Sequence, residues 1–420
     1  MTRETIERQA GGVAFDVEAV RREFPILGRR MGDRPLVYLD SAATAQKPRA
    51  VLEAMDRFYR EGYASVARGV YRLSAEATAA YESARESVAR FLGASAAELV
   101  FARGTTEAIN LLAAALAPRV AAGDEILVTR LDHHSNFVPW QRLAAERGAA
   151  FRIVECDERG EVSADAVEAA MTNRTRVVAL PHVSNALGSV LPVAEIAERV
   201  RGRGALLVVD GAQGAPHLPV DVVALGCDAY AFSGHKTYGP TGIGGLFLTA
   251  ELARALPPYQ TGGGMIRTVG DETTDFAEPP HRFEAGTPAA AEAIGLAAAV
   301  EWMAGLGRET LAAHEEALAA RAVAGLDALA GVTVLGRPRR RAGVVSFVVD
   351  GVHAHDVGTV LDAAGVAVRA GHHCAQPLMR RLGVAATVRA SFAAFNTEAE
   401  IDGLVAAVER ARDLFGGASR

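Results

Sequence analysis

The segment DAYAFSGHKTYGPTGIGG, residues 228–245, determines how the rest of the chain is interpreted. Residues 229–233 form an apolar run of strand length, and a turn rich in Gly, Ser, His and Thr follows. Lys236 lies in that turn, where a lysine is ordinarily a solvated loop residue. However, Lys47 and Lys236 are the only lysines among 44 basic residues. A desolvated amine at a strand end has a lowered pKa and is nucleophilic, so Lys236 is a candidate for amine chemistry.

Apolar runs alternate with amphipathic helical segments on both sides of this segment. The runs are 99–102, 125–129, 151–154, 177–181, 205–210 and 229–233. Strands that alternate with helices of 10 to 15 residues indicate βαβ units and a mostly parallel, buried sheet. Ligands of such sheets bind beyond the carboxyl ends of the strands. We therefore predict an α/β fold with its site at that edge.

The length of 420 residues allows a large domain with a smaller companion. The turn residues of 257–288 predict long loops, and helical spacing then runs from 289 to about 330. Shorter elements follow, with strands near 343–349 and 386–391 and helices near 356–364 and 397–415. We predict an N-terminal segment (1–30) packing with the small domain, a large domain (31–295) and a small α+β domain (296–420).

Composition and charge restrict the class of protein. Half of the residues are hydrophobic and 22% are charged, as in globular proteins, and the formal net charge of -6 provides no field for nucleic acid or an anionic membrane. Cys156, Cys227 and Cys374 are too few and too scattered for a disulfide framework or a metal site. No secretion signal or membrane-spanning stretch is evident. We expect a cytoplasmic protein with a small-molecule substrate and no metal.

Polar residues follow three of the predicted strands. Asp210, considered alone, is either a turn former or an acid that keeps a pyridinium nitrogen protonated. Thr105 and Thr106 open a predicted helix, either as N-caps or as part of a phosphate site. Ser233 and His235 would add hydrogen-bond donors to that phosphate site. An acid for a ring nitrogen, a phosphate-binding helix terminus and a lysine for an aldehyde together predict a pyridoxal 5'-phosphate (PLP) site.

Several motifs resemble those of a known family. DGAQ (210–213), SGHK (233–236) and RAGHHCAQPLM (369–379) are similar to motifs of the fold-type I, group II cysteine desulfurases, the SufS-like enzymes, which include selenocysteine lyases. The resemblance extends over YLDSAATAQKP (38–48), FARGTTEAINL (101–111), LDHHSNFVPWQ (131–141), VSNALG (183–188), RFEAGTP (282–288) and RASFAAFNT (389–397). It implies a PLP-dependent transferase with a large domain built on a mostly parallel central sheet and a smaller α+β domain.

The resemblance implies a role for each matching residue. Lys236 would bind the cofactor aldehyde covalently, Asp210 the ring nitrogen and Gln213 the ring hydroxyl, while His134 would stack on the ring and assist proton transfer. Thr105, Thr106, Ser233 and His235 would bind the phosphate, and Thr287 would reach it from the other subunit of a homodimer. Asn185 would contact the cofactor and, with Arg389, hold the substrate carboxylate, with Arg68 and Arg369 as further substrate contacts.

Cys374 differs in its surroundings from the two other cysteines. It lies between a His-His pair and an apolar stretch, in a glycine-containing segment that we expect to be accessible. Cys156 and Cys227 are interpreted as small buried apolar residues. A positive charge such as Arg369 would favour the nucleophilic form of the Cys374 thiol. Cys374 is therefore the candidate sulfur acceptor.

The resemblance implies conversion of L-cysteine to L-alanine, with the sulfur carried on Cys374 as a persulfide for iron–sulfur cluster assembly. A selenocysteine lyase and a pathway-specific PLP lyase or transaminase are alternatives that keep the cofactor. A non-catalytic dimeric scaffold is an alternative of a different class. Ser41, Ala67 and Tyr71 stand where family members often have Asn or His, which leaves the substrate preference open.

The acceptor of the sulfur is the least determined feature. Residues 351–379 resemble the branch of the family that works with a zinc-bearing SufU-type protein, in which His355 would engage the partner's zinc. A histidine at a helix start beside Asp356 is equally consistent with a surface or capping residue. An acceptor of SufE type is the alternative partner.

Overall fold

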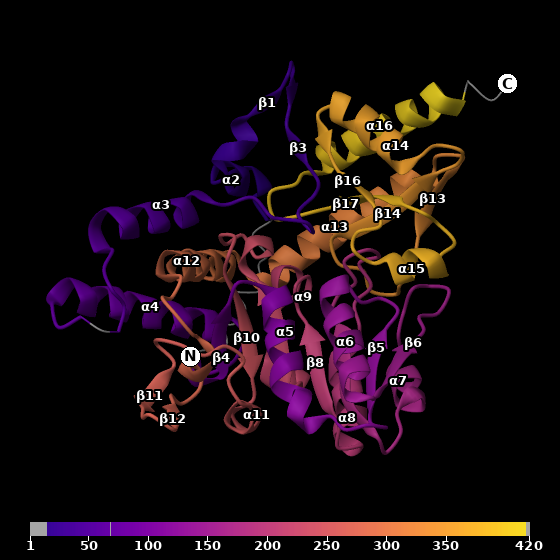
Figure 1. The fold of residues 1–420 in the computed structure, drawn as a ribbon. Coiled ribbons are helices and arrows are strands. Elements are labelled where there is room, and N and C mark those ends of the chain that lie inside the picture. Colours follow the sequence, from indigo (N-terminus) through magenta and orange to yellow (C-terminus); the bar gives the residue numbers. More distant parts are fainter. Residues whose placement is uncertain (1–14, 68, 417–420) are drawn as a thin grey trace, which may run out of the picture.

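The computed structural model describes residues 15–67 and 69–416. A seven-stranded sheet with the order β4-β10-β9-β8-β7-β5-β6 forms its centre (Figure 1). The strands are β4 (Leu99–Ala102), β5 (Glu125–Thr129), β6 (Ala150–Val154), β7 (Thr175–Pro181), β8 (Leu206–Asp210), β9 (Ala229–Ser233) and β10 (Gly244–Leu248). Strands β9, β8, β7, β5 and β6 pair in parallel, whereas β10 is antiparallel to both of its neighbours. The predicted mostly parallel sheet is confirmed.

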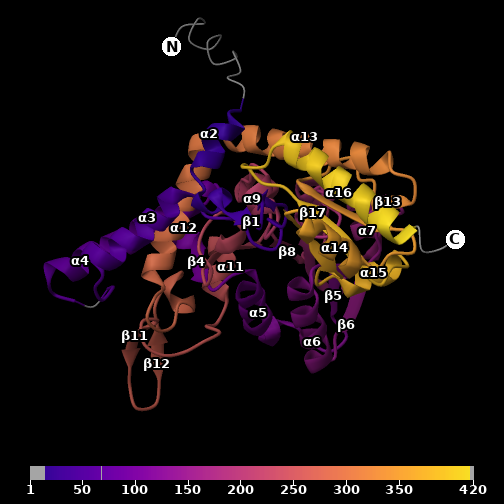
Figure 2. The ribbon, with the colours of Figure 1, turned by 90° about the horizontal axis from the view of Figure 1, so that it is seen from above.

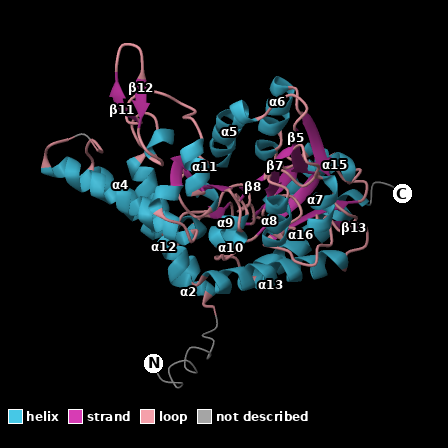
Figure 3. Ribbon diagram, turned by 90° about the horizontal axis from the view of Figure 1, so that it is seen from below, coloured by secondary structure: helices cyan, strands magenta, loops and turns pink. Residues whose placement is uncertain are grey.

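Helices cover both faces of this sheet, so alternate side chains of one strand enter different cores (Figure 3). Leu207 and Val209 of β8 pack with helices α4 (Arg72–Phe91), α7 (Ala164–Ala170), α8 (Val193–Gly202), α10 (Val222–Leu225) and α12 (Ala290–Leu306). Val208 packs on the opposite face with α5 (Thr105–Leu116), α6 (Val138–Arg147) and α11 (Ala250–Ala255). Burial on both faces explains why the strands are continuous apolar runs.

A second, antiparallel sheet has the order β13-β14-β17-β16. Its strands are β13 (Val332–Leu335), β14 (Val344–Val349), β16 (Arg369–Gly371) and β17 (Thr387–Ser391). Helices α13 (Arg308–Asp327), α14 (Ala354–Ala363) and α16 (Glu398–Gly416) bury their apolar side chains against it (Figure 2). The loop that carries Cys374 lies between β16 and α15 (Gln376–Arg381).

The N-terminal part of the described chain joins the small sheet. Strand β3 (Val37–Tyr38) pairs in parallel with β15 (Val366–Ala367), and Asp40 bridges to Ser391. Further elements of the described chain are α2 (Val17–Arg22), β1 (Arg30–Met31), β2 (Arg34–Pro35), α3 (Arg49–Arg57) and α9 (Gly214–His217). Helices α3, α4 and α12 project to one side of the central sheet (Figures 1 and 2).

The structure corrects three predictions from the sequence. The helix expected from 289 to about 330 is two helices, α12 and α13, bent by 80° at Gly307, which has a φ of 83°. The segment 257–288 is not all loop but contains a hairpin of β11 (Ile266–Val269) and β12 (Thr274–Phe276). The glycine-rich β10 was not expected as a strand.

The glycines of β10 reflect close packing. A Cβ on Gly244 would lie 2.3 Å from the carbonyl oxygen of Phe232, and one on Gly245 would lie 2.3 Å from the Phe232 ring. Both strand positions therefore require glycine.

The expected boundary between the large and the small domain, at residues 295 and 296, falls within α12. The first 14 residues of the expected N-terminal segment lie outside the described chain. Among the described helices, none alone has the length and apolar character of a membrane span, and only the bent pair α12–α13 meets both criteria together.

A buried ion pair fixes α4 against the central sheet. Arg85, which is 1% exposed, donates from its two terminal nitrogens to the Glu284 carboxylate at 2.5 and 2.9 Å. Glu284 also accepts from the Phe101 backbone N–H at 2.7 Å and the Tyr81 hydroxyl at 3.1 Å. Arg85 therefore supplies the positive charge that compensates this carboxylate, while Phe101 and Tyr81 supply only neutral donors.

We expect Arg85→Met to lower the free energy of unfolding by about 3–5 kcal/mol, because a largely buried carboxylate loses its partner. Urea denaturation measures the change. The matched control is Arg337→Met, which removes an exposed two-nitrogen pair with Asp327 and should cost less than about 1 kcal/mol. Equal losses in the two variants would contradict the role assigned to burial.

Candidate active site

The carboxyl ends of the parallel strands line a cavity of about 190 Å³. Strands β7, β8 and β9 end here at Pro181, Asp210 and Ser233. The small sheet contributes Arg389 of β17 and the loop that follows β16. The edge at which the sequence predicts ligand binding is therefore walled by side chains from both sheets.

Most of the residues singled out in the sequence meet in this cavity. Those that line it are Thr105, Thr106, Asn185, Asp210, Gln213, Ser233, His235, Lys236, Arg369, Cys374 and Arg389. They come from strand ends, helix starts and loops that are far apart in the chain. The structure thus places the predicted amine, acid, phosphate donors and thiol around one space.

Three other predicted residues lie elsewhere or are not described. Thr287 is exposed and lines a separate pocket beside Tyr259 and Glu284. His355 is exposed near the start of α14. Arg68 lies outside the described residues. Their predicted roles, which involve a second subunit, a partner protein and the substrate, stay predictions.

The structure places His133, rather than the predicted His134, in the cavity. The tight turn His134–Asn136 directs the second ring of the pair to the Cys374 loop instead. There the His134 backbone N–H donates to the Cys374 carbonyl at 2.8 Å, and its Nε2 accepts from the Gln376 N–H at 3.2 Å. His133 is therefore the ring of this pair that lines the cavity, and His134 anchors the Cys374 loop. The predicted stacking of a histidine on the cofactor ring stays a prediction.

His133 is held in one orientation as a neutral ring. Its Nδ1 accepts from the Ser135 backbone N–H at 3.1 Å and lies 2.8 Å from the Ser135 hydroxyl. Burial, with the nearby positive charge of Lys236, lowers the pKa of His133 to about 3. The motif at 131–141 predicts His134, whereas the fold shows that its neighbour His133 lines the cavity.

Lys236 lies in a short turn, Gly234–Lys236, directly after β9. Burial lowers the pKa of its amine from 10.5 to about 8, and the charges of Arg389 and Arg369 act in the same direction. Asp210 and Cys374 oppose this shift. A substantial fraction of the amine is therefore neutral near pH 8, as a nucleophile requires.

Asp210 ends β8 and is 4% exposed. Its carboxylate accepts one hydrogen bond among the described residues, from the Ala212 N–H at 2.9 Å. Burial raises the pKa of Asp210, which the charge of Lys236 partly offsets. A buried carboxylate with so few partners is completed by a cationic N–H, and the protonated ring nitrogen of PLP is such a group.

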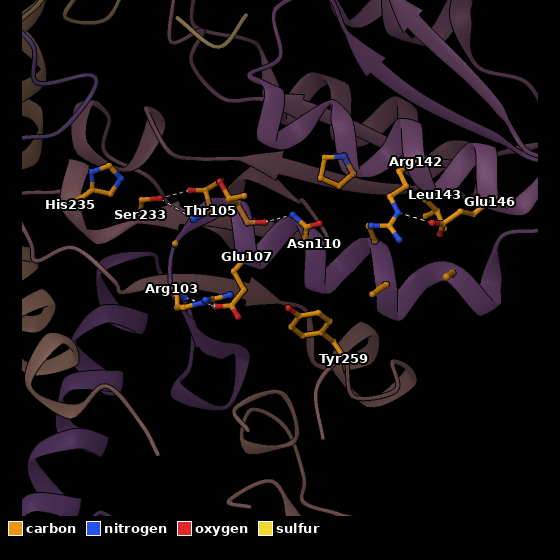
Figure 4. A pocket seen from close by; sticks show the side chains of 16 residues that line it. Arg103, Thr105, Glu107, Asn110, Arg142, Leu143, Glu146, Ser233, His235 and Tyr259 are labelled. Carbon is orange, nitrogen blue, oxygen red and sulfur yellow. Dashed lines mark hydrogen bonds and ion pairs between the residues drawn. The ribbon is translucent and has the colours of Figure 1, made fainter. Parts of the chain in front are cut away.

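The start of α5 forms a candidate phosphate site. Gly104 has a φ of 144°, and a Cβ there would lie 3.1 Å from the Ser233 hydroxyl. The Thr105 backbone N–H donates to that hydroxyl at 2.9 Å, and the two side-chain oxygens are 2.8 Å apart (Figure 4). Burial lowers the pKa of His235 to about 4, so this ring is neutral near pH 7.

The helix start opens into a larger, adjoining pocket of about 600 Å³. Thr105, Thr106, Ser233 and His235 line both spaces (Figure 4). Free N–H groups and the helix dipole favour an anion at this position. With Lys236 for the aldehyde and Asp210 for the ring nitrogen, the described residues fit PLP.

Arg389 and Asn185 leave polar atoms without partners beside the same cavity. Arg389, 2% exposed, donates to the Asn185 carbonyl at 2.9 Å and to the Asp40 carboxylate at 3.1 Å. Its Nε, and the side-chain oxygen of Asn185, have no partner among the described residues. Unsatisfied buried polar atoms are costly, so this end of the cavity is suited to a polar ligand.

The Cys374 loop holds the thiol at the cavity in an unusual backbone conformation. His373 and Cys374 have φ values of 53° and 54°, in the left-handed region. The Asn185 side-chain amide donates to the His373 carbonyl at 2.7 Å, and the Cys374 N–H donates to His372 Nδ1 at 3.2 Å. Cys374 is partly exposed, whereas Cys156 and Cys227 are buried, as predicted.

Comparison with known proteins agrees with this geometry. The Aminotransferase class-V family matches residues 37–404. A probable cysteine desulfurase of Halalkalibacterium halodurans is 48% identical over 404 residues, which are 96% of this chain and 99% of that protein.

Two solved structures are similar over nearly the whole chain. The cysteine desulfurase CsdA (S-sulfonic acid) of Escherichia coli is 40% identical with a TM-score of 0.89, covering 96% of this chain and 99% of that one. A C-DES mutant with glycine covalently linked to the PLP cofactor is 26% identical with a TM-score of 0.80, covering 93% and 98%. This chain therefore belongs to the aminotransferase class-V family.

Proposed function

We propose that this protein is a PLP-dependent cysteine desulfurase that converts L-cysteine to L-alanine and collects the sulfur on Cys374. The observation that carries the proposal is that Cys374 and Lys236 line one cavity with Asp210. A lyase or transaminase would need the amine and the acid but not the thiol. The relatives named as cysteine desulfurases support the same activity.

Five of the chain's own residues would carry out the reaction, and four of them act before the sulfur is transferred. When bound, PLP supplies an electron sink for the carbon that loses its proton. Lys236, whose amine is partly neutral near pH 8, takes that proton from the substrate, and Asp210 keeps the proton on the ring nitrogen. Arg389 would hold the substrate carboxylate through its unpartnered Nε–H. The unpartnered oxygen of Asn185 can only accept, so Asn185 would reach that carboxylate through the second N–H of its side-chain amide, whose first N–H donates to the His373 carbonyl.

The thiolate of Cys374 then attacks the sulfur of the substrate. An S–S bond forms, the C–S bond breaks, and its electron pair stays with the carbon fragment, which takes up protons and leaves as alanine. Cys374 is left as a persulfide, which a second thiol must unload. Because the loop already holds Cys374 at the cavity, this first transfer needs no large loop movement.

We propose that the enzyme is a homodimer in which Thr287 of each subunit completes the phosphate site of the other. Two observations support this. Thr287 is exposed outside the cavity of its own chain, and the phosphate site opens into the pocket of Figure 4. In addition, Tyr59, Tyr63, Val70 and Tyr71 are exposed on the projecting α3–α4 region, and apolar side chains of this size favour a protein contact.

We also propose a place in the SufS-like group, with a SufU-type protein as sulfur acceptor, a SufE-type protein as the alternative, and iron–sulfur cluster assembly as the destination. The Cys374 loop is short, because only four residues, 372–375, separate β16 from α15. A short, anchored loop requires the acceptor to approach the cavity. His355 is exposed on α14, and Gly358 of this helix packs beside Ala370 of β16, the strand that leads to Cys374.

Lys236→Ala is expected to abolish the visible absorption band of protein-bound PLP, because no other amine lines the described cavity. Borohydride reduction of the wild type, followed by peptide mapping, should label Lys236. Lys47→Arg is the matched control, since burial lowers the pKa of Lys47 to about 8 as well but Lys47 lies outside the cavity. Labelling of Lys47 would contradict the assignment.

Cys374→Ser is expected to keep the visible band and to lower sulfide release from L-cysteine by at least about 100-fold, because the hydroxyl is a poor substitute for a thiolate nucleophile. Sulfide and alanine assays measure the loss. Cys227→Ala, at a buried cysteine outside the cavity, is the control and should retain turnover. Full turnover of Cys374→Ser would favour a transaminase or lyase.

The rate at which the cofactor-free protein takes up PLP should rise with pH and level off above a midpoint near 8. The neutral amine reacts, and its fraction increases as the pH passes the lowered pKa of Lys236. Stopped-flow absorbance measures the rate. Asp210→Asn should move the midpoint lower, because the Asp210 charge raises this pKa. A midpoint near 10.5 would show that the amine is solvated.

A further inference from the structure

A buried chain of hydrogen bonds leads away from the cavity at Gln213, which is 2% exposed. The side-chain nitrogen of Gln213 donates to the Ala42 carbonyl at 2.7 Å, and its oxygen lies 3.2 Å from His217 Nε2. The other ring nitrogen of His217 lies 2.5 Å from the Glu315 carboxylate. A residue of the cavity is thus linked through α9 to a buried acid on α13.

The direction of the first two hydrogen bonds is fixed by the backbone. The Ala42 carbonyl can only accept, so the nitrogen of the Gln213 amide must face it. The amide oxygen then faces His217, and the ring nitrogen opposite that oxygen must donate. His217 is therefore protonated at Nε2.

The direction at the far end is fixed in the same way. The Ala394 backbone N–H donates to the Tyr238 hydroxyl at 2.9 Å, which leaves the hydroxyl hydrogen free for a Glu315 oxygen at 3.3 Å. The second Glu315 oxygen shares one proton with His217. His217 and Glu315 are 5% and 1% exposed, so both are shielded from bulk water.

One N–H of Gln213 is left for the cavity. The amide nitrogen has two hydrogens, and one is used by the Ala42 carbonyl. No acceptor for the other is found among the described residues, and Gln213 lines the cavity with Lys236 and Asp210. Because its oxygen is held by His217, Gln213 presents a donor to the ligand, not an acceptor.

We propose that His217, held by Glu315, is a positioning residue that fixes the Gln213 amide so that its N–H donates to the ring oxygen of bound PLP. The inference rests on the proposed function, because that oxygen belongs to the cofactor. A donor at this oxygen weakens its hold on the proton that it shares with the nitrogen of Lys236. Hydrogen bonds within such a chain strengthen one another, so the bond between His217 and Glu315 makes the Gln213 N–H a better donor.

The test is the pH titration of the visible band of the holoenzyme, which reports this shared proton without turnover. Gln213→Leu removes the donor and should move the midpoint upward by about one pH unit. His217→Leu, or His217→Phe if the first variant does not fold, should move it in the same direction. His217→Gln, which restores an N–H opposite the Gln213 oxygen, should return the midpoint toward that of the wild type.

The double variant Gln213→Leu/His217→Leu separates positioning from general damage. If His217 acts through Gln213, the double variant should have the midpoint of Gln213→Leu alone, because the second change removes nothing further. The other titratable or charged groups that line the cavity, which are unchanged in all variants, are Asp210, His133, His235, His373, Cys374, Arg369 and Arg389. Additive shifts would overturn the proposal.

His314→Gln is the matched control, because His314 lies beside Glu315 on α13 but bonds to the Asn396 carbonyl and not to the chain described above. It should leave the midpoint unchanged. An unchanged midpoint in both apolar His217 variants, with a shifted one in Gln213→Leu, would overturn the proposal while the PLP assignment stands. A wild-type protein that never develops the visible band would instead refute the proposed function.

Discussion

The site depends on the removal of one amine and one carboxylate from water at the same edge of a parallel sheet. Burial lowers the pKa of Lys236 and raises that of Asp210, and each charge partly offsets the shift of the other. A cavity that held only one of these groups would leave a buried charge without compensation. The two are held together because β8 and β9 are adjacent and parallel, so their last residues emerge side by side.

Burial of an amine does not by itself make a site. Lys47 and Lys236 both have a pKa of about 8, each because of burial. Lys47, however, donates to the carbonyls of Ala45 and His235 and lies outside the cavity. Lys236 has the acid, the thiol and the phosphate donors around it, so position and not reactivity separates the two amines.

The small sheet closes the site and brings the thiol to it. Left-handed φ values at His373 and Cys374 cost on the order of 1–3 kcal/mol each, so the surrounding contacts must hold the loop in this form. Asn185 and His134, which lie in the segments that follow β7 and β5, donate to two of its carbonyl groups, those of His373 and Cys374. These contacts explain why His134 is needed outside the cavity. They also make the loop depend on the fit between the two sheets.

The sequence by itself determined the parallel strands, the amine after β9, the acid at the end of β8 and the helix start that suits phosphate. These features are local, because a buried strand, a turn and a helix start each leave a pattern within a few residues. The antiparallel β10, the break at Gly307, the position of His133 in the cavity and the link from Gln213 to Glu315 were decided only by the tertiary structure. They depend on packing between segments that are distant in the chain, such as Gly244 against Phe232 and His217 against Glu315. No local pattern records such distances, because the same residues in another packing would meet different partners.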